Sequence, residues 1–216
     1  MKKTFVTVLL AVLLVAAVSL AEDLLLDAAW AMLTEVAKLV ERDMDDGVYE
    51  YDFRSDAAQY EVVMTADGAP LLLKTAYTGV KGSESAVLDE AAAVSAALAH
   101  AGEGASADLA LLTRSDKRYL WTVFVVNGAD VLEYEINAGT GEIREVEVYY
   151  GASGGVLPSA LLAKLKADKG DITLTDMDLE LDDGRLVCTG EATLGSARYE
   201  FEALASDGSI WEWERD

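Results

Sequence analysis

The sequence is poor in the side chains that most often build nucleophilic or metal-dependent active sites. Its 216 residues include one histidine, His100, and one cysteine, Cys188. We therefore expect no Ser-His-Asp or Cys-His catalytic arrangement and no multi-histidine metal site. A single cysteine also excludes an internal disulfide, so the stability of the fold has to come from packing alone. With 52% hydrophobic residues, a chain of this length can bury a sufficient core.

Basic residues are also scarce. Seventeen Lys and Arg residues stand against 39 Asp and Glu residues, which gives a formal net charge of −22. Such a chain is repelled by nucleic acid and by anionic lipid head groups. The charge leaves cations and basic protein surfaces as partners, or serves only solubility outside the cell.

The N-terminal segment has the composition of a secretory signal. Lys2 and Lys3 precede an apolar run over residues 5–18, and residues 19–21 (SLA) supply small residues at a cleavage site. We expect residues 1–21 to be a signal peptide cleaved after Ala21, which raises the charge of the mature chain to −24 because two lysines leave with it. The alternative is an uncleaved anchor, since residues 5–21 approach the length of a spanning helix. After cleavage we expect no stable membrane association.

Three passages of the chain resemble one another. Residues 60–68 (YEVVMTADG), 132–141 (LEYEINAGTG) and 199–208 (YEFEALASDG) each read as an alternating strand that runs through an alanine into a glycine turn. The matching alanines, Ala66, Ala138 and Ala205, lie 72 and 67 residues apart. A period of this length fits a small helix-plus-sheet module, so the sequence predicts a triplicated unit.

The second passage resembles a known family. Residues 133–143 (EYEINAGTGEI), followed by REVEVYY, are similar to the signature of the PepSY domain, and residues 88–102 (LDEAAAVSAALAHAG) resemble the helix that opens that domain. The third passage departs from the signature at Ala203 and Leu204. The first passage has Thr65 where the signature has Asp, and it lacks one residue before Asp67. The resemblance implies an α+β fold of three tandem PepSY-like modules, each a helix packed on a small antiparallel sheet. We place them at residues 22–80, 85–150 and 156–216.

Periodicity predicts one helix at the start of each module. Leu25, Ala29, Met32, Val36 and Leu39 share one face of a helix over residues 22–42. A second helix begins at the N-cap Asp89 and ends near Gly102. A third begins near Pro158 or Ser159 and stops at Gly170. The glycine- and serine-containing stretches 78–85 and 151–156 are expected to be linkers, the second the more flexible.

Alternation within the strands predicts one dry and one solvated sheet face. Leu132, Tyr134 and Ile136 point one way, while Glu133 and Glu135 point to solvent. The same pattern places Trp211 and Trp213 together, in a core beneath a helix, and leaves one of Tyr149 and Tyr150 exposed. Asn127-Gly128 and residues 182–184 (DDG) read as hairpin turns.

The remaining candidate residues have mainly structural interpretations. His100 falls in the last turn of a helix, where a partly charged ring suits the dipole, and Cys188 reads as a small buried apolar residue. Residues 43–47 (DMDDG) and 178–184 (DLELDDG) resemble the start of a calcium loop, but Phe53 and Gly190 stand where the closing glutamate belongs. We interpret both as strand and turn, with weak calcium binding as the alternative. The sequence assigns no catalytic, cofactor or metal residue, and no particular binding residue.

PepSY domains occur in propeptides of thermolysin-like metallopeptidases and in exported proteins, and binding or restraint of peptidases has been proposed for them. The resemblance thus implies a non-catalytic extracytoplasmic protein-binding module, located in the bacterial cell envelope or secreted, that binds or inhibits a secreted peptidase. The alternative is an acidic structural or cation-binding envelope protein. A hydrolase that uses carboxylates alone ranks last, because 39 acidic residues make any pair of them uninformative.

Overall fold

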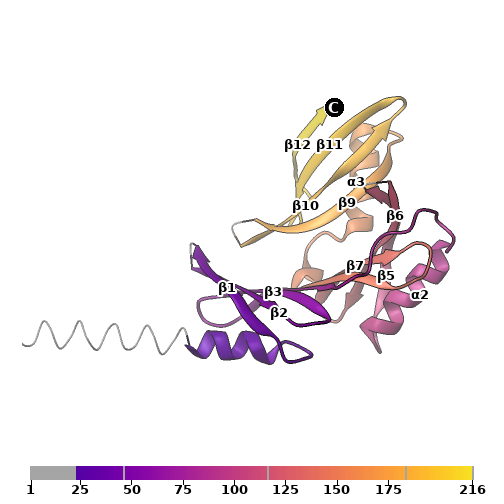
Figure 1. Ribbon diagram of the computed structural model, residues 1–216. Helices are drawn as coiled ribbons and strands as arrows, with labels where there is room; N and C mark the ends of the chain where they lie inside the picture. The colour runs from indigo at the N-terminus through magenta and orange to yellow at the C-terminus, as the bar shows by residue number, and fades with distance from the viewer. Residues whose placement is uncertain (1–22, 46, 116, 183, 216) are drawn as a thin grey trace, which may run out of the picture.

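The computed structural model describes residues 23–45, 47–115, 117–182 and 184–215 (Figure 1). The predicted signal peptide lies outside the described residues. Within the described part of the chain, no helix is both long and apolar enough to span a membrane.

A helix followed by four strands occurs three times along the chain. The first unit has a helix over residues 23–31 and the strands β1 (Lys38–Asp45), β2 (Val48–Arg54), β3 (Ala58–Thr65) and β4 (Pro70–Tyr77). The second unit has α2 (Glu90–Ala101), β5 (Ser106–Ser115), β6 (Arg118–Asn127), β7 (Asp130–Asn137) and β8 (Ile143–Tyr149). After the short 3₁₀ helix η1 (Ala152–Gly154), the third unit has α3 (Pro158–Lys169), β9 (Thr173–Asp182), β10 (Arg185–Leu194), β11 (Ala197–Leu204) and β12 (Ile210–Arg215).

The mixture of helices and antiparallel strands confirms the α+β class, but the strands do not form three small sheets. β4 pairs with β8, with Leu73 opposite Val148, so the first two units share one eight-stranded sheet in the order β1-β2-β3-β4-β8-β7-β6-β5. The third unit keeps a separate sheet in the order β12-β11-β10-β9. The sequence could not indicate this, because pairing between two edge strands depends on backbone groups that every residue carries.

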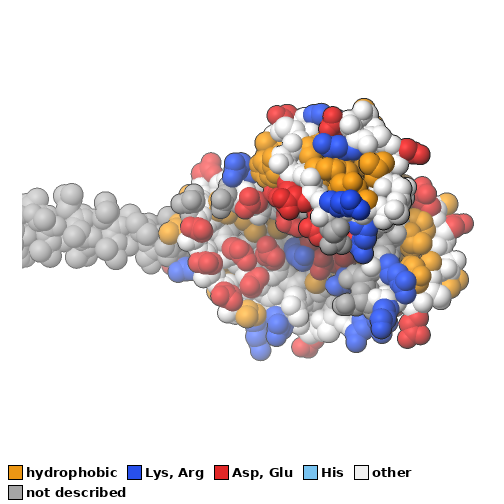
Figure 2. Space-filling view, turned by 90° about the horizontal axis from the view of Figure 1, so that it is seen from above, with side chains coloured by type: hydrophobic (Ala, Val, Ile, Leu, Met, Phe, Trp, Pro, Cys, Tyr) orange, Lys and Arg blue, Asp and Glu red, His pale blue; other side chains and the backbone are white. Residues whose placement is uncertain are grey.

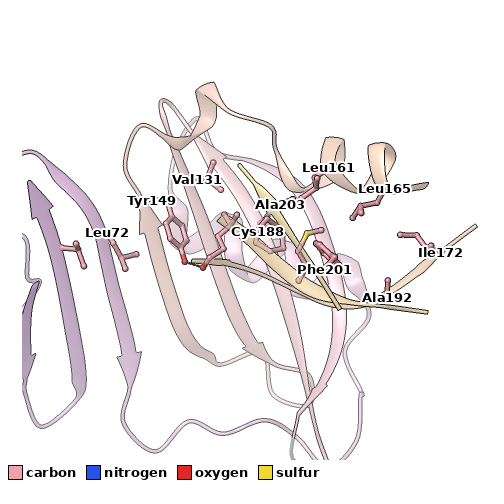
Figure 3. Close-up of a cluster of buried hydrophobic side chains, with 14 residues drawn as sticks. Leu72, Val131, Tyr149, Leu161, Leu165, Ile172, Cys188, Ala192, Phe201 and Ala203 are labelled. Carbon is pink, nitrogen blue, oxygen red and sulfur yellow. Dashed lines mark hydrogen bonds between the residues drawn. The ribbon is translucent and has the colours of Figure 1, made fainter. Parts of the chain in front are cut away.

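Helices cover one face of the large sheet and the third unit covers part of the other (Figure 1). On the helical face, Leu25 and Ala29 pack on Tyr51 and Phe53, and Ala93 and Ala97 of α2 pack in a second core with Tyr134 and Ile136. On the opposite face a third core joins the units (Figure 3). It includes Leu72 and Tyr149 of the large sheet, Leu161 and Leu165 of α3, and Cys188 and Phe201 of the small sheet.

The first predicted helix is much shorter than expected. It ends at residue 31, and residues 38–45 form β1 instead. Leu25 and Ala29 are buried as the periodicity indicates, but Val36 is 95% exposed. Glu35 accepts hydrogen bonds from Ser55 and Tyr60, and the backbone beyond it pairs with β2. Tertiary pairing therefore overrides a weak helical pattern.

The other two helices begin and end as predicted. Asp89 caps α2 by accepting a hydrogen bond from the Ala92 N–H at 2.9 Å, and the helix stops at Gly102, where φ is 88°. α3 begins at Pro158 and stops at Gly170, where φ is 101°. The Ser159 N–H donates to Asp108 of β5, so the second unit supplies a cap to the helix of the third.

The three similar passages occupy equivalent places. They form β3, β7 and β11, the third strand of each unit, together with the turn that follows. In each turn the glycine N–H donates to the backbone carbonyl of the residue before the matching alanine. The pairs are Gly68 to Thr65, Gly141 to Asn137 and Gly208 to Leu204. These glycines have φ values of 85°, 78° and 66°, which an L-residue rarely adopts. The repeated alanine-to-glycine pattern thus marks a turn at the same place in all three units, and the first turn is one residue shorter than the other two.

Both predicted linkers are held in place. Ser83 exchanges backbone hydrogen bonds with Tyr119, within the stretch 78–85. In the stretch 151–156, η1 forms, Ser153 donates to the Ala129 carbonyl, and Val156 donates to the Ala205 carbonyl. Residues 151–156 are thus hydrogen-bonded to neighbouring turns, and their greater flexibility stays a prediction.

The prediction for the two tryptophans is also wrong. A bulge in β12 at Trp211 shifts the alternation, so Ile210 and Trp213 both pack against the core while Trp211 is 46% exposed. Trp213 stacks on Tyr199 at a centroid distance of 4.9 Å. Of the tyrosine pair, Tyr149 is buried and Tyr150 is half-buried, so neither side chain is fully exposed.

Candidate functional site

A cleft of about 500 Å³ lies between the two sheets. We call it the inter-sheet cleft. Acidic side chains dominate its lining, and red carboxylates gather on this side of the molecule in Figure 2. The acidic lining residues are Asp43, Asp45, Glu50, Glu61, Glu133, Glu135, Glu145, Glu147, Asp178 and Glu180, and Lys74 is the basic one.

Strand register explains why so many carboxylates meet here. Residues directly opposite each other on paired strands point to the same face. One such row crosses five strands, with Asp52 opposite Glu61, Glu61 opposite Lys74, Lys74 opposite Glu147, and Glu147 opposite Glu133. The β4–β8 pairing that fuses the first two units therefore also assembles this charged row.

The row corrects the prediction that the strand glutamates are solvated. Glu133 has 6% of its surface exposed, because β9 of the small sheet lies over it. The alternation itself is right, since Leu132 and Tyr134 pack beneath α2 while Glu133 points the other way. What the alternation could not indicate is that the face opposite α2 is covered by the third unit.

Lys74 is the central cation of the cleft. Its ammonium group lies 2.9 Å from a Glu145 oxygen and also pairs with Glu147. Burial disfavours the charged ammonium, but the hydrogen bonds and charges of Glu147 and Glu145 outweigh it and raise the pKa of Lys74. Lys74 thus joins β4 to β8 at the boundary between the first two units.

Several carboxyl groups of the cleft are harder to ionise than usual. Burial, and then the charge of Glu50, raise the pKa of Glu61 to about 7, against the opposing effect of Lys74. Burial raises the pKa of Glu135 to about 7, although Arg144 opposes it. Burial, with the charge of Asp176, raises the pKa of Asp178 to about 6. These groups therefore exchange protons near neutrality, where ordinary carboxylates stay ionised.

Glu133 forms the floor of the cleft and connects the two sheets. One of its oxygens accepts a hydrogen bond from the Leu179 N–H of β9 at 2.9 Å. Burial raises its pKa well above the ordinary value, and the charges of Asp178 and Glu147 act in the same direction. Next to it, the Tyr149 hydroxyl contacts both the Glu147 carboxylate and the Leu179 carbonyl. Sequence reasoning missed this group because its acids come from β7, β8 and β9, whose contact is tertiary.

The single histidine, His100, and the single cysteine, Cys188, are not among the residues that line the inter-sheet cleft. His100 is in the last turn of α2, with Nδ1 3.2 Å from the Tyr134 hydroxyl, on the helical face of the large sheet. Cys188 is 1% exposed in β10, where burial raises the pKa of its thiol. A buried, protonated thiol is a poor nucleophile.

The two calcium-like segments form hairpins, as the interpretation of strand and turn predicts. Asp43 and Asp45 end β1, and Asp178 to Asp182 end β9, with left-handed glycines at 47 and 184. Residues 46 and 183 lie outside the described part. Both hairpins contribute to the inter-sheet cleft. Beside it, Glu50, Asp52 and Glu61 bring carboxylate oxygens within 4.8 Å of one another, the kind of cluster that can hold a cation.

A second feature is the free edge of the large sheet. Among the described strands, β1 pairs only with β2, and all eight of its residues are exposed. Val40 is 59% exposed and Met44 56% exposed, both large apolar side chains. Glu41 and Asp43 lie opposite Asp52 and Glu50, so they share a face with those acids and continue the acidic surface from the cleft to the edge.

Comparison with known proteins identifies part of the chain. No curated protein matches the sequence. Two solved structures do: one described as a lipoprotein of Clostridium difficile 630, at 12% identity over 53% of this chain and 84% of the other with a TM-score of 0.32, and the C-terminal domain of YpeB from Bacillus megaterium, at 13% identity over 91% of this chain and 96% of the other with a TM-score of 0.34. At these low scores neither structure defines the function of this chain.

The family model named "Peptidase propeptide and YPEB domain", or PepSY, matches residues 87–147. This range contains α2 and β5 to β7 entire and nearly all of β8, and it includes the passage on which the sequence resemblance rests. PepSY domains are typically regulatory or propeptide-like rather than catalytic. The second helix-and-four-strand unit of this chain is a PepSY domain.

Proposed function

We propose that the protein is a non-catalytic extracytoplasmic module that binds a secreted peptidase and restrains it. The observation that carries the proposal is β1, an eight-residue edge strand with every residue exposed. An extended segment of a partner can add to such an edge, with main-chain hydrogen bonds giving affinity and alternate side chains giving selectivity. The PepSY match of the adjoining unit supports a peptidase as that partner.

The surroundings of β1 favour a partner segment that carries basic residues. Glu41 and Asp43 of β1, with Glu50 and Asp52 of β2, form an acidic face beside the edge. Complementary charge raises the association rate and is screened within about 8 Å at physiological salt. Raising the salt concentration should therefore slow association and leave dissociation nearly unchanged.

The test measures binding and inhibition with purified mature protein. Thermolysin-like peptidases, and secreted peptidases of the producing organism, are assayed for activity and for binding at micromolar concentrations. The variant Val40→Lys with Met44→Lys places two repulsive, solvated side chains on β1, and we expect it to weaken binding about tenfold or more. Val87→Lys is the matched control, because Val87 is 72% exposed but lies outside β1. If both variants bind the peptidase equally well, β1 is not part of the interface.

The alternative is a cation-binding envelope protein, which the cluster of Glu50, Asp52 and Glu61 favours. A calcium titration that follows the melting temperature separates the two functions. Stabilisation by calcium, together with no binding or inhibition of any peptidase, would replace the peptidase proposal by the cation-binding one. The predicted cleavage after Ala21 is tested separately, by the intact mass of the exported protein.

A further inference from the structure

The contact between the third unit and the large sheet brings acidic side chains of both sheets together with little compensating positive charge. We propose that this contact is a proton-controlled latch: a proton held on Glu133 of β7, where its carboxyl group meets β9, keeps the two sheets together, and its loss loosens the third unit. The peptidase proposal is not required for this inference, because the latch lies on the face of the large sheet that the third unit covers.

Glu133 is almost completely shielded from solvent at the floor of the inter-sheet cleft. It is 6% exposed, and its Oε2 accepts the Leu179 N–H of β9 at 2.9 Å. A carboxyl group buried without a cation of its own favours the protonated form, because its charged form would lose hydration. The hydrogen bond from Leu179 therefore makes the Glu133 carboxyl group a direct link between β7 of the large sheet and β9 of the small sheet.

The charged and titratable groups that face Glu133 come from every strand packed around it. They are Glu147 and Tyr149 of β8, Lys74 of β4 through its pair with Glu147, Asp178 and Glu180 of β9, and Cys188 of β10. On its other side, Glu133 is opposite the apolar Phe124 of β6. Among the described residues lining the cleft, Lys74 is the only cation, and it is engaged by Glu145 and Glu147. A second negative charge at the β7–β9 contact would therefore be poorly compensated.

The direction of the pH effect follows from linkage. Burial raises the pKa of Glu133 well above 4.5, and that of Asp178 to about 6, so the closed state holds protons that an open, solvated state would release. The extra stability of the closed state is complete below about pH 4, the ordinary range of these carboxyls, and is lost as the pH rises through the raised values. The latch is closed in acid and weakened in neutral to alkaline solution.

The Leu179 amide is a direct reporter, because its proton lies in the latch. Hydrogen exchange of the mature protein is measured from pH 4.5 to 8 and corrected for the intrinsic exchange rate. We expect the protection factor of Leu179 to fall about tenfold per pH unit, for each proton released, as the pH rises from 4.5 toward the raised pKa of Glu133. Amides of α2, which packs on the opposite face of the large sheet, should change much less.

Glu133→Gln tests the assignment, since an amide keeps an acceptor for the Leu179 N–H but does not titrate. In this variant we expect the pH dependence of the Leu179 protection factor to weaken by the contribution of one proton, which is about tenfold per pH unit. Glu200→Gln is the matched control: Glu200 holds the same repeat position in β11 but is exposed, so the slope should persist. Asp178→Asn provides the same test if Glu133→Gln does not fold. An unchanged slope in the folded Glu133 or Asp178 variant, or no slope in the natural protein, would overturn the latch.

Discussion

The second and third units use the same strand pattern with opposite results for one glutamate. Glu133 in β7 and Glu200 in β11 are equivalent residues of the repeated passage, and both precede an aromatic residue that is buried in a core, Tyr134 and Phe201. Glu133 is 6% exposed, whereas Glu200 is exposed. The difference arises because the third unit covers the second, while no described element covers the outer face of the third. A position in a repeat therefore fixes which face a side chain occupies, but not whether that face is wet.

The largest expected effect distinguishes the two faces of the small sheet in the third unit. Phe201 is 3% exposed and packs in the core shared with the large sheet. Phe201→Ala should lower the free energy of unfolding by about 3 to 5 kcal/mol. Its neighbour Glu200 points away from this core, so Glu200→Ala should change stability by less than about 0.5 kcal/mol. Urea unfolding of both variants measures the contrast, and similar losses would mean that both faces are buried.

A smaller effect is expected at the charged row beneath the third unit. Lys74→Met leaves Glu145 and Glu147 without their shared cation, and we expect a loss of about 2 kcal/mol at pH 7, below the range for fully buried pairs because the Lys74 side chain is 33% exposed. Since Lys74 also lowers the pKa of Glu61, the variant should raise that pKa above about 7. Urea unfolding and carboxyl titration by NMR test both statements.

The control for that variant is Lys169→Met in α3. Lys169 pairs with the 59% exposed Asp168 and lies over the Trp213 ring, contacts at the surface of the third unit. Surface pairs of this kind contribute about 0 to 1 kcal/mol. If Lys169→Met lowers the free energy of unfolding as much as Lys74→Met does, ion pairs on the covered face of the large sheet contribute no more than ion pairs on the surface of the third unit.

The smallest expected effects distinguish a helix cap supplied by the residue before the helix from a cap supplied by a strand of another unit. Asp89 caps its own helix, α2, whereas Asp108 of β5 accepts hydrogen bonds from the N–H and hydroxyl of Ser159 in α3. Asp89→Ala and Asp108→Ala should each cost about 1 kcal/mol. Hydrogen exchange should locate the first loss in α2 and the second in α3. Faster exchange in α2 upon substitution of Asp108 would contradict this assignment.

Local features were predictable where the deciding contacts are close in sequence. The Asp89 cap, the stops at Gly102 and Gly170, and the three glycine turns all depend on hydrogen bonds over a few residues, and the structure confirms them. The helix expected over residues 22–42 failed because its second half forms β1 by pairing with β2. The core position expected for Trp211 failed because one bulge reverses the alternation in β12.

The candidate site was largely invisible in the sequence. Its acids were recognised as one face of alternating strands, but 39 acidic residues do not reveal which of them meet. Lys74 carries no local signal at all, since its role comes from standing opposite Glu147 across the β4–β8 pairing. That pairing joins strands 73 positions apart, so no short pattern can encode it.

By itself, the sequence determined the helices α2 and α3, the turns that close each third strand, the PepSY character of the second unit and the faces on which Glu133 and Glu200 lie. These features follow from backbone preferences and side-chain alternation, which act over a few residues. Only the tertiary structure decided that the first two units share one sheet and that the third unit buries Glu133 against Leu179. Burial depends on which surfaces meet. When a second sheet excludes the water around a carboxyl group, its charged form becomes unfavourable and the group retains its proton at higher pH.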